Sequence, residues 1–148
     1  MPKIDLDSIT PKIGSGYPPP HDQPIGKAQF RRLAPAAGVV DFEINHVTLS
    51  EGEWSSQRHW HEGEDEFLVM LAGAATLVEE TGETPLVAGD CVAFPKRVPN
   101  GHHLRGGEGG CVFVVWGKPE ATPCHYPDVD LWLDPKDGFY RHKDGTPY

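Results

Sequence analysis

The feature that most constrains the fold is a regular succession of short apolar segments between residues 39 and 116, each followed by turn residues. None of the segments shows the 3.6-residue periodicity of a helix, and all have the length of a strand. The glycine-containing stretches 72–74 and 106–110 are predicted to be turns. We therefore expect an all-β protein, an antiparallel sandwich or barrel with almost no helix. The segments cover residues 39–49, 54–60, 66–71, 75–79, 85–87, 91–94, 102–105 and 111–116.

Irregular segments flank this region on both sides. Residues 1–37 contain seven of the 15 prolines, which interrupt any regular element. This proline-rich N-terminal arm either stays disordered or lies across a partner subunit. We expect the barrel to span residues 38–118. Residues 119–148 are expected to form a C-terminal arm packed on the barrel, because apolar positions alternate within residues 126–133.

Charge and composition exclude several classes of partner. The chain carries 22 acidic and 13 basic residues, a net charge of −9, and such a surface repels nucleic acids and anionic membranes. No stretch reaches the roughly 18 apolar residues of a membrane span, and the N-terminus lacks the apolar core of a signal peptide. Cys91, Cys111 and Cys124 have no metal-binding spacing, which indicates reduced, buried thiols. We expect a cytoplasmic protein that binds neither nucleic acid nor membranes.

Residues 57–67 contain most of the side chains that suggest a functional site. On a strand, alternate side chains point to the same face and lie about 7 Å apart along the chain. His59 and His61 can therefore converge on one ion. The acidic stretch 62–65 turns the chain, and Glu66 then opens the next strand, where its carboxylate can complete the cluster. Two imidazoles and a carboxylate suit Fe, Mn, Ni, Co or Zn. The segment therefore predicts a site for one divalent transition metal ion.

The spacing of these residues resembles the first signature motif of the cupin superfamily. After the His-x-His pair, four residues precede Glu66 and six more precede Gly73. The stretch from Gly89 to His102 resembles the second cupin motif. The chain as a whole is similar to small single-domain bacterial cupins. The resemblance implies a cupin double-stranded β-helix, or jelly-roll barrel, with a metal inside its mouth and a homodimeric assembly.

The second motif departs from the usual cupin pattern. Asn100 stands at the position where that motif normally has a ligand histidine. If the loop is two residues longer, His102 takes the ligand role and shares the inward face with Leu104. His102 is therefore the first candidate for the fourth ligand, with His103 and then Asn100 as the alternatives.

The resemblance implies a function only in outline, because cupins with this ligand set include dioxygenases, decarboxylases, isomerases, epimerases and lyases. We predict a metalloenzyme acting on a small polar metabolite (an organic acid, sugar derivative or aromatic compound) that chelates the ion. Gln57 is the candidate catalytic residue, in contact with substrate or a metal-bound water; a supporting hydrogen bond is its alternative role. The competing function is a non-catalytic small-molecule-binding or sensory module. Cys124 and His125 suggest a nucleophile, but nothing else in the sequence supports one.

Overall fold

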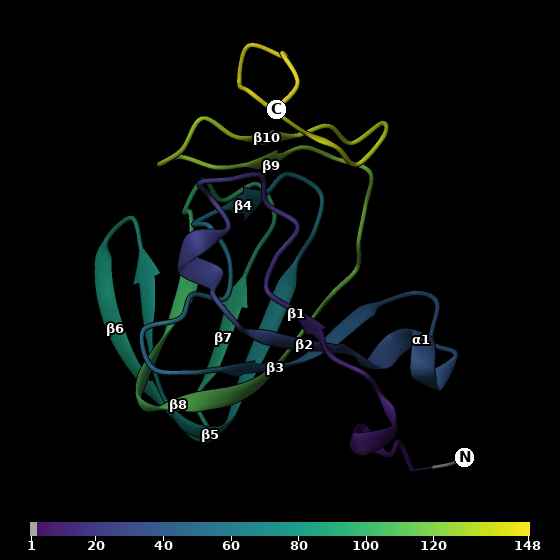
Figure 1. The fold of residues 1–148 in the computed structure, drawn as a ribbon, viewed down its shortest axis with the longest axis vertical. Coiled ribbons are helices and arrows are strands. Elements are labelled where there is room, and N and C mark those ends of the chain that lie inside the picture. Colours follow the sequence, from purple (N-terminus) through teal and green to yellow (C-terminus); the bar gives the residue numbers. More distant parts are fainter. Residues whose placement is uncertain (1–2) are drawn as a thin grey trace.

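The computed structural model describes residues 3–148 and arranges them in two antiparallel sheets (Figure 1). The predicted all-β jelly-roll architecture is confirmed. Helical structure within these residues is limited to α1 (Leu33–Ala37) and the 3-10 turns Leu6–Ser8 and Gln23–Ile25. The larger sheet contains β1 (Lys12–Ile13), β2 (Gln29–Arg32), β3 (Glu43–Leu49), β5 (Glu66–Glu79), β6 (Gly82–Val87), β7 (Cys91–Phe94) and β8 (His103–Gly117), and the smaller contains β4 (Trp60–His61), β9 (Cys124–His125), β10 (Trp132–Leu133) and β11 (Tyr140–Arg141).

Strands β5 and β8 are the two longest strands of the larger sheet. They pair along most of their length, from Glu66 opposite Gly117 to Val78 opposite His103. On its other edge β5 pairs first with β7 and then with β6. Beyond β8 the sheet continues through β3, β2 and β1. Glu66 therefore stands at the end of a strand that is hydrogen-bonded on both sides.

The turns predicted at residues 72–74 and 106–110 are wrong, because both stretches continue inside β5 and β8. The pairing register shifts twice within residues 70–75, which marks bulges that bend the sheet. Gly73 has φ +72°, and a Cβ atom there would lie 2.2 Å from the carbonyl oxygen of Gly110. The glycines thus allow two bent strands to approach closely.

The core lies between the inward faces of the larger sheet and the segment that precedes β2. On β5 and β8, apolar residues alternate between the inside and the outside, as expected for a sheet with one buried face. The buried residues of the core are Ile25, Ala28, Val47, Leu49, Leu68, Met70, Ala75, Leu77, Leu86, Leu104, Cys111 and Phe113.

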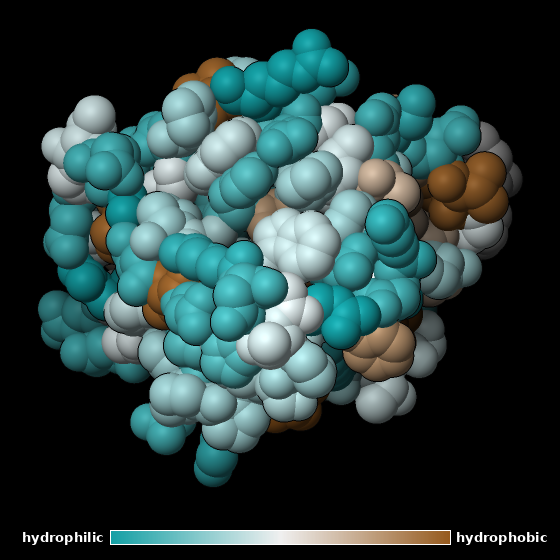
Figure 2. Space-filling model, turned by 90° about the horizontal axis from the view of Figure 1, so that it is seen from above, coloured by the Kyte–Doolittle hydropathy of each residue, from teal (hydrophilic) through white to brown (hydrophobic). Residues whose placement is uncertain are grey.

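Both flanking segments lie against this body. Within the N-terminal segment, β2 hydrogen-bonds along β3. In the C-terminal segment β9 pairs with β4, so the last strands lie across one end of the molecule (Figure 1). There Cys124, Tyr126 and Leu131 form a second buried cluster, against which Tyr17 packs. The surface of this end is mainly hydrophilic (Figure 2). The limits of the barrel at residues 38 and 118 remain predictions.

Within residues 3–148 no helix has the length and apolar character needed to cross a membrane.

Candidate metal centre

Three histidines and a glutamate meet where β4, β5 and the start of β8 come together. His61 lies on β4 and Glu66 begins β5. His59 and His102 precede β4 and β8 and are joined by two backbone hydrogen bonds of 3.2 and 2.9 Å. Oε2 of Glu66 lies 3.2 Å from Nε2 of His102. The same oxygen lies 3.6 Å from Nε2 of His61 and 4.0 Å from Nε2 of His59. One carboxylate oxygen thus faces three imidazole nitrogens.

Backbone carbonyls orient two of these rings. Nδ1 of His59 lies 2.9 Å from the carbonyl oxygen of Gln57, and Nδ1 of His102 lies 3.2 Å from that of Asn100. A neutral imidazole has a single N–H, and these carbonyls are acceptors for it at Nδ1. The Nε2 lone pairs of both rings then face the Glu66 carboxylate. That arrangement is favourable when a cation or a proton lies between them.

Burial and mutual proximity determine the charges of the cluster. Burial lowers the pKa of His59 to about 3 and also lowers the pKa of His61. Burial alone would raise the pKa of Glu66, but a proton between Nε2 of His102 and the carboxylate, which makes a hydrogen bond, and the other nearby histidines lower it to about 2. At neutral pH the cluster therefore presents the neutral imidazoles of His59 and His61 beside one carboxylate.

The chemistry of these donors fits a divalent transition metal. Ligand atoms of His59, Glu66 and His102 all lie within 4.8 Å of one another. The side chains of the cluster, that of His61 included, are only 7% to 18% exposed, so an ion among them would be largely removed from bulk water. Imidazole nitrogen and carboxylate oxygen are ligands that Fe, Mn, Co, Ni and Zn accept. The group can hold a metal, and the ligand role of each residue stays a prediction.

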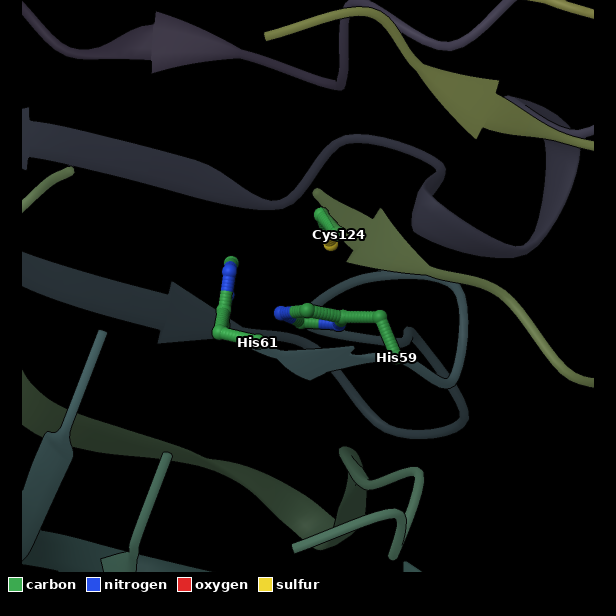
Figure 3. A group of neighbouring side chains, drawn as sticks. All are labelled: His59, His61 and Cys124. Carbon is green, nitrogen blue, oxygen red and sulfur yellow. The ribbon is translucent and has the colours of Figure 1, made fainter. Parts of the chain in front are cut away.

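A second group of ligand atoms includes a cysteine. Sγ of Cys124 and ring nitrogens of His59 and His61 lie within 4.8 Å of one another. Figure 3 shows the thiol directed toward the two rings. Cys124 is 2% exposed, and this burial raises the pKa of its thiol to about 12. Sequence reasoning missed its place in the cluster, because the proximity depends on where β9 lies and no local motif marks it.

The two alternatives for the fourth ligand have other partners. The His103 ring packs on Trp54 with ring centroids 4.2 Å apart. Within the described residues, neither ring nitrogen of His103 has a hydrogen-bond partner. The side-chain amide of Asn100 donates to Glu79 at 2.8 Å. The structure thus brings His102 against the carboxylate of Glu66 and directs His103 and Asn100 elsewhere.

Gln57, the predicted catalytic residue, is buried beneath the N-terminal segment. Its side-chain amide donates to the carbonyl oxygen of His21 at 2.6 Å. The regular strand predicted over residues 54–60 is wrong, since only its last residue lies in β4. Alternation along a strand therefore does not place Gln57 beside His59, although its backbone carbonyl orients that ring. A catalytic role for its side chain stays a prediction.

Glu64, which sequence reasoning assigned to the connecting turn, lies at the edge of the cluster. One of its carboxylate oxygens is 3.9 Å from Nδ1 of His61, and its side chain is 16% exposed. Burial, followed by repulsion from Glu66, raises the pKa of Glu64 to about 7. No spacing rule identifies such a residue, because the shift depends on how the turn folds back over the cluster.

A cavity of about 140 Å³ adjoins the cluster inside the barrel. His59, Glu66 and His102 form part of its wall. The remaining wall combines apolar side chains with the polar groups of Asn45, Ser55, Ser56 and His103. Pockets for drug-sized ligands typically measure about 300–1,000 Å³. The cavity therefore admits a small molecule, or one end of a larger one.

Comparisons with known proteins agree with this fold. The family model described as the Cupin domain matches residues 45–117. No curated protein matches the chain in sequence. Among solved structures, a protein from Silicibacter pomeroyi named as a sugar phosphate isomerase from a cupin superfamily is 38% identical. That match has a TM-score of 0.92 and covers 99% of this chain and 96% of the other.

Two more distant structures support the fold alone. A protein from Acidithiobacillus ferrooxidans, provisionally named as a sugar phosphate isomerase, is 22% identical with a TM-score of 0.74, covering 86% of this chain and 83% of the other. A predicted oxalate decarboxylase from Thermotoga maritima is 20% identical with a TM-score of 0.65, covering 80% of this chain and 99% of the other.

Proposed function

Because the chain belongs to the cupin superfamily, we propose that it is a metal-dependent enzyme acting on a small polar metabolite. The proposed ligands are His59, His61, Glu66 and His102. One observation carries the proposal: Oε2 of Glu66 lies 3.2 to 4.0 Å from the Nε2 atoms of all three histidines. Such a donor set leaves coordination positions open for a substrate.

The surrounding chain holds this donor set rigidly. The carbonyl oxygens of Gln57 and Asn100 fix the rings of His59 and His102. Phe94 stacks on His102 with ring centroids 3.6 Å apart and planes inclined by 4°, which also keeps water from that side of the ring. When bound, a divalent metal acts as a Lewis acid toward a substrate oxygen. Fixed ligands would hold that oxygen in a constant position.

A sugar phosphate is the substrate class that we favour, and isomerisation is the reaction. The Silicibacter pomeroyi protein named as a sugar phosphate isomerase is similar to this chain over nearly the whole of both sequences. The carbonyl and neighbouring hydroxyl of an open-chain sugar offer two oxygens for chelation. The cavity of about 140 Å³ suits that end of the molecule, and Asn45, Ser55 and Ser56 offer hydrogen bonds to its hydroxyls. The phosphate would remain outside the cavity.

Turnover of sugar phosphates by metal-loaded protein tests this proposal. Chelator-stripped protein is reloaded separately with Fe, Mn, Co, Ni or Zn and incubated with aldose and ketose phosphates, and the isomers are resolved by NMR. We expect interconversion with at least one metal, none in the stripped protein, and none with Glu66→Gln. The matched control is Glu83→Gln, which changes an exposed carboxylate paired with Arg105.

Two results would contradict the proposal. If loaded protein binds sugar phosphates without converting them, the chain is a small-molecule-binding module and the catalytic claim fails. If Glu66→Gln converts them as fast as the wild type, the cluster is not the catalytic centre. The homodimer and the cytoplasmic location expected from the sequence remain predictions, which light scattering and cell fractionation would check.

A further inference from the structure

Cys124 brings a sulfur atom to the cluster from a part of the chain far from the histidine motif. It is the residue opposite His61 in the pairing of β9 with β4. Its Sγ and ring nitrogens of His59 and His61 lie within 4.8 Å of one another (Figure 3). Atoms this close can share one ion after small side-chain rotations, because metal–nitrogen and metal–sulfur bonds measure about 2.0 to 2.3 Å.

Residues on both sides of Cys124 fix its position. The carbonyl oxygen of Pro123 accepts a hydrogen bond from the backbone N–H of Glu62 at 3.2 Å. His125 stacks on Trp60 with ring centroids 4.2 Å apart and planes inclined by 13°. The thiol is therefore placed by strand pairing and packing.

An ion pair ties the same C-terminal segment to the histidine motif. The guanidinium of Arg58, next to His59 in sequence, donates two hydrogen bonds of 2.6 Å to the carboxylate of Asp128. It also pairs with Glu80 at 2.7 Å. The Arg58 side chain is only 13% exposed, which favours a defined geometry. The segment that supplies the sulfur is thus anchored beside the segment that supplies two imidazoles.

The geometry points to Cys124 as a sulfur ligand of this metal centre, with His59 shared by the imidazole–carboxylate group and the imidazole–thiolate group. The inference rests on the proposed metal function and narrows the range of metal ions that the centre would bind. A thiolate selects softer ions such as Zn, Co, Ni and Fe over Mn, which prefers oxygen ligands. On binding, the S–H bond of Cys124 breaks, its proton passes to solvent and the sulfur–metal bond forms.

Cobalt spectroscopy on the full-length protein tests the sulfur ligand directly. Stripped protein is titrated with Co(II), and its visible and near-ultraviolet absorption is recorded. The d–d bands in the visible report binding at the centre, and an intense near-ultraviolet band reports sulfur-to-cobalt charge transfer. We expect both in the wild type. In Cys124→Ser and Cys124→Ala we expect the d–d bands to persist and the charge-transfer band to be lost.

Two other cysteines provide matched controls. Cys91 is exposed and Cys111 is buried in the main core, so Cys91→Ser and Cys111→Ala should both keep the charge-transfer band. Cobalt bound without that band, or the band retained in the Cys124 variants, would overturn the sulfur ligand while leaving the proposed metal function intact. Failure to take up any cobalt would overturn both.

Metal preference gives a second, independent readout. Loss of a residue that merely supports a ligand already costs about 10- to 100-fold in metal affinity. We therefore expect Cys124→Ser to weaken Zn binding by at least about tenfold and to change Mn binding much less. An equal loss of affinity for both ions, or no loss for either, would contradict the inference. X-ray absorption of the zinc form should show a sulfur neighbour at about 2.3 Å in the wild type alone.

Discussion

Nε2 of His102 lies 3.2 Å from Oε2 of Glu66, although the two residues stand 36 positions apart in the chain. The contact joins the beginning of β5 to the residue just before β8, and it brings the two motif regions into one cluster. With Nδ1 of His102 directed at a backbone carbonyl, a neutral ring presents a lone pair to the carboxylate. A cation between the two groups attracts both the lone pair and the carboxylate and so removes their mutual repulsion. This attraction is the physical basis of the proposed centre.

The two adjacent histidines before and within β8 should respond oppositely to substitution. His102→Phe removes a proposed ligand and should lower metal affinity by at least about tenfold. His103→Phe replaces a buried ring without hydrogen-bond partners in the described chain and keeps an aromatic surface against Trp54. Its metal affinity should be unchanged and its stability equal or higher by about 1 kcal/mol. Calorimetric titration and thermal melts measure both, and the reverse pattern would identify His103 as the ligand.

Acid should destabilise the metal-free protein, although Glu64, whose pKa burial raises to about 7, takes up one proton in the folded state and partly offsets the effect. Burial lowers the pKa of His103 to about 4 and that of His59 to about 3, from an ordinary value of 6.5. As the pH falls from about 6.5 to about 4, the unfolded chain binds protons that the folded chain does not. The free energy of unfolding should therefore decrease by up to about 1.4 kcal/mol per pH unit for each such histidine. Urea melts with chelator present measure the slope, which His103→Phe should reduce. Equal stability at pH 7 and pH 5 would contradict the account.

Arg58 should anchor the C-terminal strands. Because Asp128 and Glu80 are more than half exposed, solvent screens these pairs, and Arg58→Ala should cost only about 1–2 kcal/mol of stability. We also expect faster proteolysis within residues 118–148. The control is Arg105→Ala, which removes an exposed pair with Glu83 and should change stability by about 0.5 kcal/mol or less. Equal protease sensitivity in the two variants would contradict an anchoring role for Arg58.

Gly73 should be hard to replace. Its φ of +72° disfavours any side chain, and an added Cβ would lie 2.2 Å from the carbonyl oxygen of Gly110. Gly73→Ala should destabilise the protein by more than about 2 kcal/mol in denaturant melts. Gly16→Ala is the control, because the nearest atom to its added Cβ is the flexible Lys12 Nζ at 3.5 Å. Similar stability of the two variants would show that β5 and β8 do not need the close approach.

The local part of the candidate site could be predicted from sequence, because its members lie close together in the chain. His59, His61 and Glu66 are within one short stretch, and the turn between His61 and Glu66 returns the chain to the same place. His102 required the resemblance to a family, since its place depends on the length of a loop. The all-β fold followed from the spacing of apolar segments and turns.

Features that depend on the course of the chain in the tertiary structure could not be predicted. A glycine in a turn and a glycine in a bulge look the same in sequence, so the sequence predicts a turn at Gly73 although β5 continues through it. Cys124 reaches His61 only through a two-residue strand pairing, whose position depends on the whole C-terminal segment. Burial raises the pKa of Glu64, and the acidic composition of its turn gives no sign of that burial.

The most direct test of the central claim is the amount of metal that the chain binds with and without the Glu66 carboxylate. Stripped protein is loaded with Zn or Co, desalted and measured by elemental analysis beside Glu66→Gln, which preserves shape and removes charge. We predict one ion per chain in the wild type and in the control Glu83→Gln, and a loss of at least about tenfold in affinity for Glu66→Gln. Full retention of the ion by folded Glu66→Gln would show that the convergence on Glu66 is not a metal centre.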